Sequence, residues 1–590
     1  MNKEQLEQKL REIHGNDEEQ IEFILSDEKK IIVTAPAGCG KTKTMISKIA
    51  YKLVTTPNLN FKKVLALTFS VNAATKIKED TARILPQLIE RENYDLDKKL
   101  DVSNYHSFAT KLINNHGYII HENLKGVDGF TIVSDNVQLL TKYLTATEID
   151  KINELSKAVN ELDYDKVNNL QEDYFNILVN KLIPNNVVTY DGLLILANRL
   201  LSVENIRNFY KKFYPIVIID EFQDTNYLAY KLITHIIDKN DNNTVILMGD
   251  DIQKIYGFLG AIPNIFNHMR STYNMTSMEF KTNYRFKDNE KMKKLDFYLR
   301  EIFRNYDSIE KFRESAEINF GFYTTRNDEA KKIVDCMVGN VKDGNNVALL
   351  VRGKKNANNV ISHLEARGIS YFNGLFSDID LPYKKFHRVA LDIFLRESGS
   401  SKSISKKVLD KVVTEVKAQQ SKITDDNIMF NSLIRLLEAL FSNVKTLDIK
   451  RIEKYNKIIF ILGNNSLKRL MNEIDENIVL TTVHGAKGLE WDYVYIPEVM
   501  ESKFPNYFGL CRDCKDSDSA IKYDNACQFK FLNHLKTNFE EELSLFYVAI
   551  TRARKDVFIF ANTEKQNNFP QKRSCFTMLP NLSFNREDEI

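Results

Sequence analysis

Residues 31–46 read IIVTAPAGCGKTKTMI, and this stretch decides the expected fold class. It begins with β-branched residues 31–33, which are typical of a buried strand in a parallel sheet. A loop of small residues follows, and Lys41 and Thr42 then open a segment with the apolar spacing of a helix. A strand, a small-residue loop, a Lys-Thr pair and a helix in this order form a phosphate-binding P-loop. The stretch therefore predicts an α/β domain that binds a nucleotide.

The residues of this loop have distinct expected roles. Gly38 and Gly40 let backbone N–H groups turn toward an anion, and the helix N-terminus adds its positive end. The Lys41 ammonium is expected to reach the β- and γ-phosphates, and the Thr42 hydroxyl to bind Mg²⁺. ATP and Mg²⁺ are therefore the expected cofactors. The expected nucleotide-binding residues of the loop are Ala37, Gly38, Cys39, Gly40, Lys41, Thr42 and Lys43. The alternative is a plain turn between strand and helix, since Ala35 replaces the usual first Gly.

Length and composition bound the class of protein. A chain of 590 residues, 43% of them hydrophobic, is long enough for about three to five packed domains. The 82 basic and 80 acidic residues nearly balance, so any nucleic-acid surface has to be a local channel. The sequence shows no signal peptide, and no uncharged apolar run approaches the roughly 20 residues of a membrane span. With only six Cys, a reducing cytoplasmic location without membrane partners is expected.

Two further strands end in residues suited to nucleotide hydrolysis. Residues 215–224, PIVIIDEFQD, form an apolar run that ends in paired acids. Asp220 is expected to hold Mg²⁺ and Glu221 to polarise the attacking water, although a simple Asp-Glu turn is the alternative. Residues 244–253, TVILMGDDIQ, place Gln253 where it can contact the γ-phosphate or the water.

The remaining pattern indicates two sheets and two helical interruptions. Residues 113–187 and 385–475 are charged, helical in character and poor in strand signals, whereas a second set of strands follows residue 317. The expected organisation is a first α/β domain (1–112 and 188–283) with a helical insertion (113–187), a second α/β domain (284–384 and 476–565) with a second helical insertion (385–475), and a polar C-terminal tail (566–590).

Several motifs occur together in a characteristic order. They are DEFQDTN, GDDIQKIYGF, NYR, TVHGAKGLEW and YVAITRAR. Over about residues 16–561 the chain thereby resembles the UvrD/Rep/PcrA family of superfamily-one DNA helicases. The resemblance implies an α/β fold with two RecA-like P-loop-type parallel-sheet domains, each with a mainly helical insertion. It also implies ATP-driven movement in the 3′ to 5′ direction on single-stranded DNA and unwinding of tailed duplexes.

The resemblance also implies roles for single residues. Gln20 matches the adenine-reading Gln, Tyr284 the residue that stacks on adenine, and Glu490 the Glu near the ribose. Arg285 and Arg552 match the two arginine fingers, which act from opposite sides of the interdomain cleft. With these, the implied catalytic residues are Glu221, Lys41, Gln253, Arg285 and Arg552. The implied contacts to single-stranded DNA are Phe69, His106, Tyr256, Phe258 and His484.

Some positions depart from the family pattern and leave a second function open. Leu259 stands where the family has an Arg that contacts DNA, and Leu543-Ser544 stand where it often has Arg-Arg. Fewer cationic contacts imply a weaker grip on the phosphate backbone, and the second insertion is shorter than usual. The alternative is a DNA-stimulated ATPase subunit that unwinds little and regulates a separate nuclease, similar in outline to the UvrD-like subunit of the Gabija anti-phage system. A P-loop small-molecule kinase would have no use for the second domain.

One cluster of metal-ligand residue types remains. Cys511, Cys514, Cys527 and His534 have a spacing that permits a single zinc site. The competing interpretation is four unconnected residues, because there is no second closely spaced ligand pair.

Overall fold

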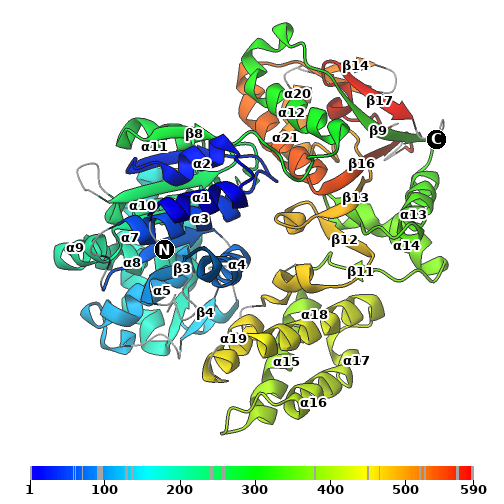
Figure 1. Ribbon diagram of the computed structural model, residues 1–590. Coiled ribbons are helices and arrows are strands. Elements are labelled where there is room, and N and C mark those ends of the chain that lie inside the picture. The colour runs from blue at the N-terminus through cyan, green and yellow to red at the C-terminus, as the bar shows by residue number, and fades with distance from the viewer. Residues whose placement is uncertain are drawn as a thin grey trace. The chain divides into compact units, whose positions relative to one another are not determined.

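The structure is a computed structural model, and the chain divides into two compact units, Met1–Lys287 and Asp288–Ile590, which are described separately (Figure 1). The described residues are 3–56, 59, 61–69, 71–89, 98–125, 130–133, 138–237, 243–255, 257, 260–377, 380–447, 451–463, 465–516, 520–523, 526–565 and 571–586.

The first unit is built on a six-stranded sheet in the order β3-β2-β6-β7-β1-β8. Every neighbouring pair in it is parallel. The strands are β1 (Lys30–Thr34), β2 (Val64–Thr68), β3 (Leu100–Asn104), β6 (Ile216–Ile219), β7 (Thr244–Gly249) and β8 (Thr276–Glu279). The helices around it are α1 (Lys3–Ile13), α2 (Glu18–Leu25), α3 (Lys41–Thr55), α4 (Val71–Ile89), α5 (Tyr105–His116), α9 (Glu204–Phe213), α10 (Tyr227–Ile236) and α11 (Ile265–Tyr273).

Burial on both faces explains why β1 is β-branched throughout its middle. Ile31 and Val33 belong to the hydrophobic cluster that includes residues of α1 to α4. Ile32 points the opposite way, into the cluster that includes residues of α5, α8 (Tyr190–Ser202) and α10. A parallel strand covered on both faces has no polar side, so the apolar run follows from the layer arrangement.

The first insertion packs into the same hydrophobic core as one face of the sheet and does not form a core of its own. Its helices α6 (Ala146–Asn160) and α7 (Tyr164–Ile177) contribute to the same cluster as Ile32, together with α8 (Tyr190–Ser202). The region is mainly helical, as expected, but it also contains one short strand. The short strand β4 (Thr131–Val133) lies in it and pairs in parallel with β5 (Val187–Thr189). Three-residue strands are too short to leave a periodic signal in the sequence.

The second unit contains a seven-stranded sheet, β11-β12-β10-β13-β16-β9-β17, again parallel throughout. Its strands are β9 (Ala316–Tyr323), β10 (Val347–Val351), β11 (Phe372–Asn373), β12 (Ile478–Thr482), β13 (Trp491–Ile496), β16 (Ala553–Asn562) and β17 (Leu582–Arg586). The helices that contact the sheet or one another beside it are α12 (Glu290–Arg304), α13 (Arg326–Lys342), α14 (Asn358–Ala366) and α21 (Lys536–Ile550). The two parallel sheets confirm the predicted α/β fold class.

The described residues between 381 and 473 of this unit are mainly helical and include no strand. The helices are α15 (Leu381–Ser398), α16 (Lys406–Lys417), α17 (Gln420–Ile423), α18 (Asn427–Thr446) and α19 (Arg451–Gly463), followed by a 3₁₀ segment, Leu467–Glu473. Figure 1 shows α15, α16, α18 and α19 gathered as one group, and α15 contacts both α16 and α19. No described helix of the chain is long and apolar enough to cross a membrane.

The C-terminal segment differs from the expected polar tail. Its strand β17 pairs in parallel with β9 over five residues, from Leu582 opposite Ala316 to Arg586 opposite Phe320. The Ser574 N–H also donates to the Val499 carbonyl at 3.1 Å. The sequence pattern missed this strand because an edge strand buries fewer side chains and alternates weakly.

Candidate active site

The P-loop occupies the turn between β1 and α3. Gly40 caps α3 with a left-handed backbone (φ 73°), and Gly38 is left-handed as well (φ 89°). A Cβ on Gly38 would lie 2.5 Å from Asn283 Oδ1 and 2.7 Å from Arg285 Cβ, so only glycine fits this approach. The Lys41 ammonium donates to the Ala35 carbonyl at 3.1 Å, across the mouth of the loop. The loop thus has the shape and the cation that an anionic ligand needs.

The acids that follow β6 lie next to this lysine. Lys41 Nζ and Glu221 Oε1 are 4.0 Å apart. Glu221 has a left-handed backbone (φ 52°), and its N–H donates to Asp220 Oδ1 at 2.9 Å. Asp220 is buried, with 4% of its surface exposed. Because β7 alone separates β6 from β1 in the sheet, the acids and the P-loop meet at the same carboxyl edge.

A chain of hydrogen bonds continues from Glu221 to Gln253. Gln223 Nε2 donates to Glu221 Oε2 at 2.6 Å, and Gln223 Oε1 accepts from the Asp250 N–H at 3.2 Å. Gln253 Nε2 in turn donates to Asp250 Oδ2 at 2.7 Å. Lys41, Glu221 and Gln253 are therefore brought together through two residues, Gln223 and Asp250, to which the sequence analysis assigned no role. Their position inside the DEFQD and GDD motifs was the available signal.

A second network ties α2 to the P-loop. Gln20 Nε2 donates to the Cys39 carbonyl at 3.0 Å, and Gln20 Oε1 accepts from His14 Nδ1. The other ring nitrogen of His14 then accepts from Ser47 Oγ at 2.8 Å. Burial lowers the pKa of His14, which agrees with a neutral ring that donates on one side and accepts on the other. His14 was missed because a lone histidine in the turn after a helix carries no pattern.

Residues 283–285 are fastened to the P-loop backbone. The Tyr284 N–H donates to the Gly38 carbonyl at 2.9 Å, and Asn283 Nδ2 donates to the Ala37 carbonyl at 3.0 Å. The Tyr284 hydroxyl donates to Asp17 Oδ2 at 2.6 Å, and burial, followed by Asp17, raises the pKa of this phenol. Tyr284 and Arg285 consequently belong to the first unit, and the unit ends at Lys287 instead of the expected residue 283.

The second unit carries the other residues implied for nucleotide binding. The Arg552 guanidinium is buried, and it donates to the Val548 carbonyl at 3.0 Å and the Leu489 carbonyl at 3.3 Å. Glu490 is 41% exposed at its side chain and lies 3.6 Å from the Arg554 guanidinium. His484 begins a short 3₁₀ segment, His484–Ala486, after β12.

Three of the five residues expected to contact DNA lie in the part of the chain that the structure describes. Phe69 packs, partly buried, against the core of the first unit. His106 lies in the first turn of α5, with its ring edge-on to Tyr190 at a centroid distance of 5.3 Å. Tyr256 and Phe258 lie outside the described residues.

The whole chain was compared with known protein families and curated proteins. The family description "UvrD/REP helicase N-terminal domain" matches residues 16–274, and "UvrD-like helicase C-terminal domain" matches residues 394–564. The chain belongs to the UvrD-like family of superfamily-one DNA helicases. This confirms the family resemblance of the motifs, and with it the assignment to ATP-dependent DNA helicases as a class.

Curated relatives cover most of this UvrD-like chain. A "Probable DNA helicase II homolog" of Mycoplasma genitalium is 26% identical, over 91% of this chain and 83% of that protein. The "ATP-dependent DNA helicase Rep" of Buchnera aphidicola is 24% identical, over 92% of both chains. The "ATP-dependent DNA helicase PcrA" of Leuconostoc citreum is 23% identical, over 92% of this chain and 82% of that protein.

Proposed function

We propose that this UvrD-like protein moves 3′ to 5′ along single-stranded DNA and unwinds tailed duplexes by hydrolysing ATP. The observation that carries the proposal is the 4.0 Å approach of Lys41 and Glu221 at one sheet edge, beside a glycine loop shaped for an anion. The approach supports ATP hydrolysis, since Lys41 is suited to bind phosphate and Glu221 to accept the proton of an attacking water. The DNA substrate and the direction of movement rest on the family resemblance.

Each residue of the site has a role in this proposal. Lys41 and the loop N–H groups bind the phosphates, and Gln223 orients the Glu221 carboxylate by donating to it. Thr42 and Asp220 would hold Mg²⁺, an oxygen-seeking ion suited to a hydroxyl and a carboxylate. When bound, Mg²⁺ neutralises charge on the phosphates. Gln253 is proposed to sense the γ-phosphate through its link to Asp250.

The adenosine and the arginine fingers complete the proposed nucleotide site. Gln20 and Tyr284 would contact the adenine, and Glu490 of the second unit the ribose. Arg285 is held beside the P-loop, whereas Arg552 donates within its own unit. Arg552 is 2% exposed, so its guanidinium has to become accessible before it can act on a phosphate. The proposed contacts to DNA remain Phe69, His106, Tyr256, Phe258 and His484.

Steady-state ATPase assays with and without single-stranded DNA test the hydrolysis step. Glu221→Gln keeps the size of the side chain and the hydrogen-bonding oxygen, so ATP should still bind while kcat falls by about 10²- to 10⁴-fold. Glu79→Gln, in α4 and away from the P-loop motifs, is the matched control and should keep full activity. Full turnover by Glu221→Gln would refute the role given to Glu221.

Strand displacement on two duplexes tests the direction. Unwinding of a 3′-tailed duplex and not of a 5′-tailed one is expected, because the protein would enter on the tail and move toward its 5′ end. The reverse preference would overturn the proposed polarity.

A second candidate function is a DNA-stimulated ATPase subunit that unwinds little and regulates a separate nuclease in anti-phage defence. One observation favours weak unwinding. Leu543 of α21, at a position where relatives often carry Arg, is fully buried, and the adjacent Ser544 hydroxyl donates to the Glu540 carbonyl at 2.6 Å. Neither side chain is available to DNA phosphates. DNA-stimulated ATPase without displacement of either duplex would select this alternative.

A further inference from the structure

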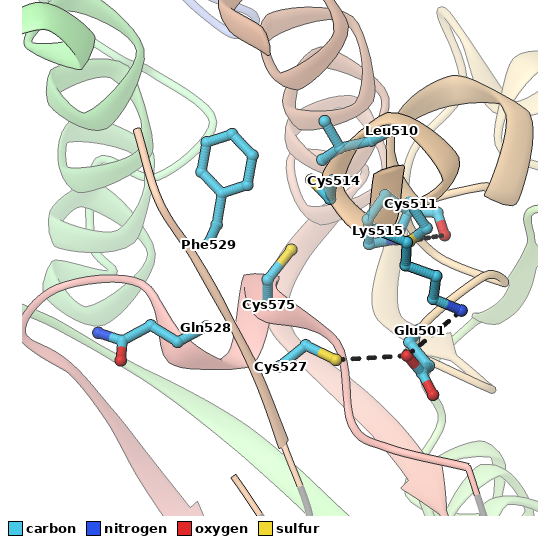
Figure 2. A pocket seen from close by; sticks show the side chains of 10 residues that line it. Glu501, Leu510, Cys511, Cys514, Lys515, Cys527, Gln528, Phe529 and Cys575 are labelled. Atoms are coloured by element: carbon cyan, nitrogen blue, oxygen red, sulfur yellow. Dashed lines mark hydrogen bonds and ion pairs between the residues drawn. The ribbon is translucent and has the colours of Figure 1, made fainter. Parts of the chain in front are cut away.

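A small cavity in the second unit is lined by four cysteines from three separate segments (Figure 2). Its volume is about 20 Å³, room for one ion or water molecule but not for an organic ligand. All four thiols are free of disulfides and at most 8% exposed. They are Cys511 and Cys514 from the π-helical turn Tyr507–Cys511 and helix α20 (Arg512–Asp516), Cys527 from β15 (Ala526–Phe529), and Cys575 from the 3₁₀ segment Cys575–Met578.

The backbone holds these segments against one another. The Cys527 N–H donates to the Arg573 carbonyl at 3.1 Å, which fixes the segment before Cys575 beside β15. Cys511 and Cys514 are separated by two residues and leave the same turn, so both can face the cavity. Main-chain hydrogen bonding therefore brings Cys575 close to Cys527, although the two are distant in the sequence.

The sulfurs have polar neighbours of two kinds, a backbone N–H that favours a thiolate and a carboxylate that favours a protonated thiol. The Ser502 N–H donates to Cys511 Sγ at 3.2 Å, and such a bond stabilises negative charge on sulfur. Cys527 Sγ donates to Glu501 Oε2 at 3.4 Å, and Lys515 Nζ lies 3.7 Å from the same oxygen. Figure 2 shows Glu501 and Lys515 at the rim beside Cys527. A cation at the rim offsets part of the negative charge of four thiolates.

We propose that Cys511, Cys514, Cys527 and Cys575 form a closed, structural Zn²⁺ site. Four thiolates are a soft ligand set that selects zinc, and a site with four protein ligands leaves no position for a substrate. The ion would tie together β15, α20 and the segment that leads into β17, independently of the nucleotide site.

The thiols have to turn inward to bind. Within the described ranges, no three or more His, Cys, Asp or Glu side chains already have an arrangement that holds a metal ion. Burial raises the pKa values of Cys511, Cys514 and Cys527, and these thiols would have to lose their protons on binding a metal ion. Binding requires the four sulfurs to come within the Zn–S distance of about 2.3 Å of one point.

The proposed ligands differ at one position from those that the sequence spacing indicated, with Cys575 in place of His534. His534 belongs to the 3₁₀ segment Asn533–Leu535 and does not line the cavity, whereas Cys575 does. The sequence could not indicate Cys575, because it lies far along the chain from the other three cysteines.

Elemental analysis of the full-length protein, purified without chelators and dialysed after exposure to ZnCl₂, tests the proposal. We expect about one zinc per chain, held through dialysis. Cys514→Ser and Cys575→Ser should each lower the zinc content severalfold. His534→Ala and Cys336→Ser, which removes a thiol of α13 outside the cavity, should keep it. Absence of zinc from the wild type, or iron with labile sulfide in its place, would overturn the proposal.

Two further outcomes keep the test decisive. Zinc lost in His534→Ala but kept in Cys575→Ser would overturn the ligand assignment. If the cysteine variants do not fold, Co²⁺ added to the metal-free wild type should give the intense thiolate-to-cobalt absorption of a tetrahedral four-sulfur site, and its absence would refute the site.

Discussion

The carboxyl edge of the first sheet and the corresponding motifs of the second unit are built differently. In the first unit, Lys41, Glu221 and Gln253 are joined by a continuous set of ion pairs and hydrogen bonds. In the second, the Arg552 guanidinium is committed to carbonyls of its own unit. The hydrolytic residues of the first unit therefore hold one another in place, whereas the Arg552 guanidinium is buried within its own unit and has to become accessible before it can contribute.

Replacing Arg552 should have the largest effect on ATP turnover, and it tests whether the second unit takes part in hydrolysis. Arg552→Ala removes a proposed arginine finger, so kcat for ATP should fall by about 10³-fold or more while the affinity for ATP changes little. It also leaves the Val548 and Leu489 carbonyls without this donor, so the melting temperature should fall. DNA-stimulated ATPase and thermal unfolding check both.

Arg554→Ala is the matched control. Arg554 is exposed by 38% at its side chain and pairs with Glu490 and Asp492, so its loss should cost far less stability. Equal turnover by Arg552→Ala and the wild type would show that Arg552 serves packing alone.

Acid should weaken the second unit through His387. This side chain of α15 is fully buried, donates from Nδ1 to the Tyr383 carbonyl at 2.9 Å and accepts the Leu467 N–H at 3.1 Å. Burial lowers its pKa to about 4. The unfolded chain therefore binds the extra proton first, and stability should be complete above about pH 6.5 and fall toward pH 4, by about 3 kcal/mol in total.

Urea unfolding between pH 7 and pH 4.5 measures this loss. The dependence should be smaller in His387→Gln, whose amide can both donate and accept. An unchanged slope in that variant would assign the acid sensitivity to other groups.

Replacing Gln223 tests the hydrogen-bonded set of residues in the first unit. Gln223→Ala removes the donor to Glu221 and the acceptor of the Asp250 N–H, so kcat should fall by about 10- to 100-fold, the scale expected for orienting residues. The KM for ATP should change little, since the hydrogen bonds of Gln223 go to Glu221 and Asp250. Asn168→Ala, at a hydrogen bond on the exposed surface, serves as the control.

His14 should give the smallest effect. His14→Ala frees the Gln20 amide from one partner and should raise the KM for ATP by about threefold, the cost of one neutral hydrogen bond. Preference for ATP over GTP should weaken, while kcat stays near the wild-type value. Ser47→Ala, one bond further from Gln20, should show a smaller change of the same kind. A fall in kcat without a change in KM would place His14 outside adenine recognition.

The sequence predicted those features whose residues are contiguous along the chain. The strand-loop-helix around Lys41 and the acids after β6 are contiguous in sequence, and the fold class and family followed from them. His14, Gln223 and Asp250 were missed because hydrogen bonds between segments leave no periodic trace. Cys575 and β17 were missed for a related reason, since their partners lie far from them along the chain.

The pairing of β17 with β9 also sets an order of assembly during synthesis. The first unit is one continuous stretch of chain, so all its strands exist before the second unit begins. In the second unit, β9 lies between β16 and β17 in the sheet. Because more than 200 residues of chain separate β9 from either strand, it is synthesised long before it can pair with them. Until the ribosome has made β17, the edges of this hydrophobic strand are open to other chains, which makes the second unit the one most in need of a chaperone.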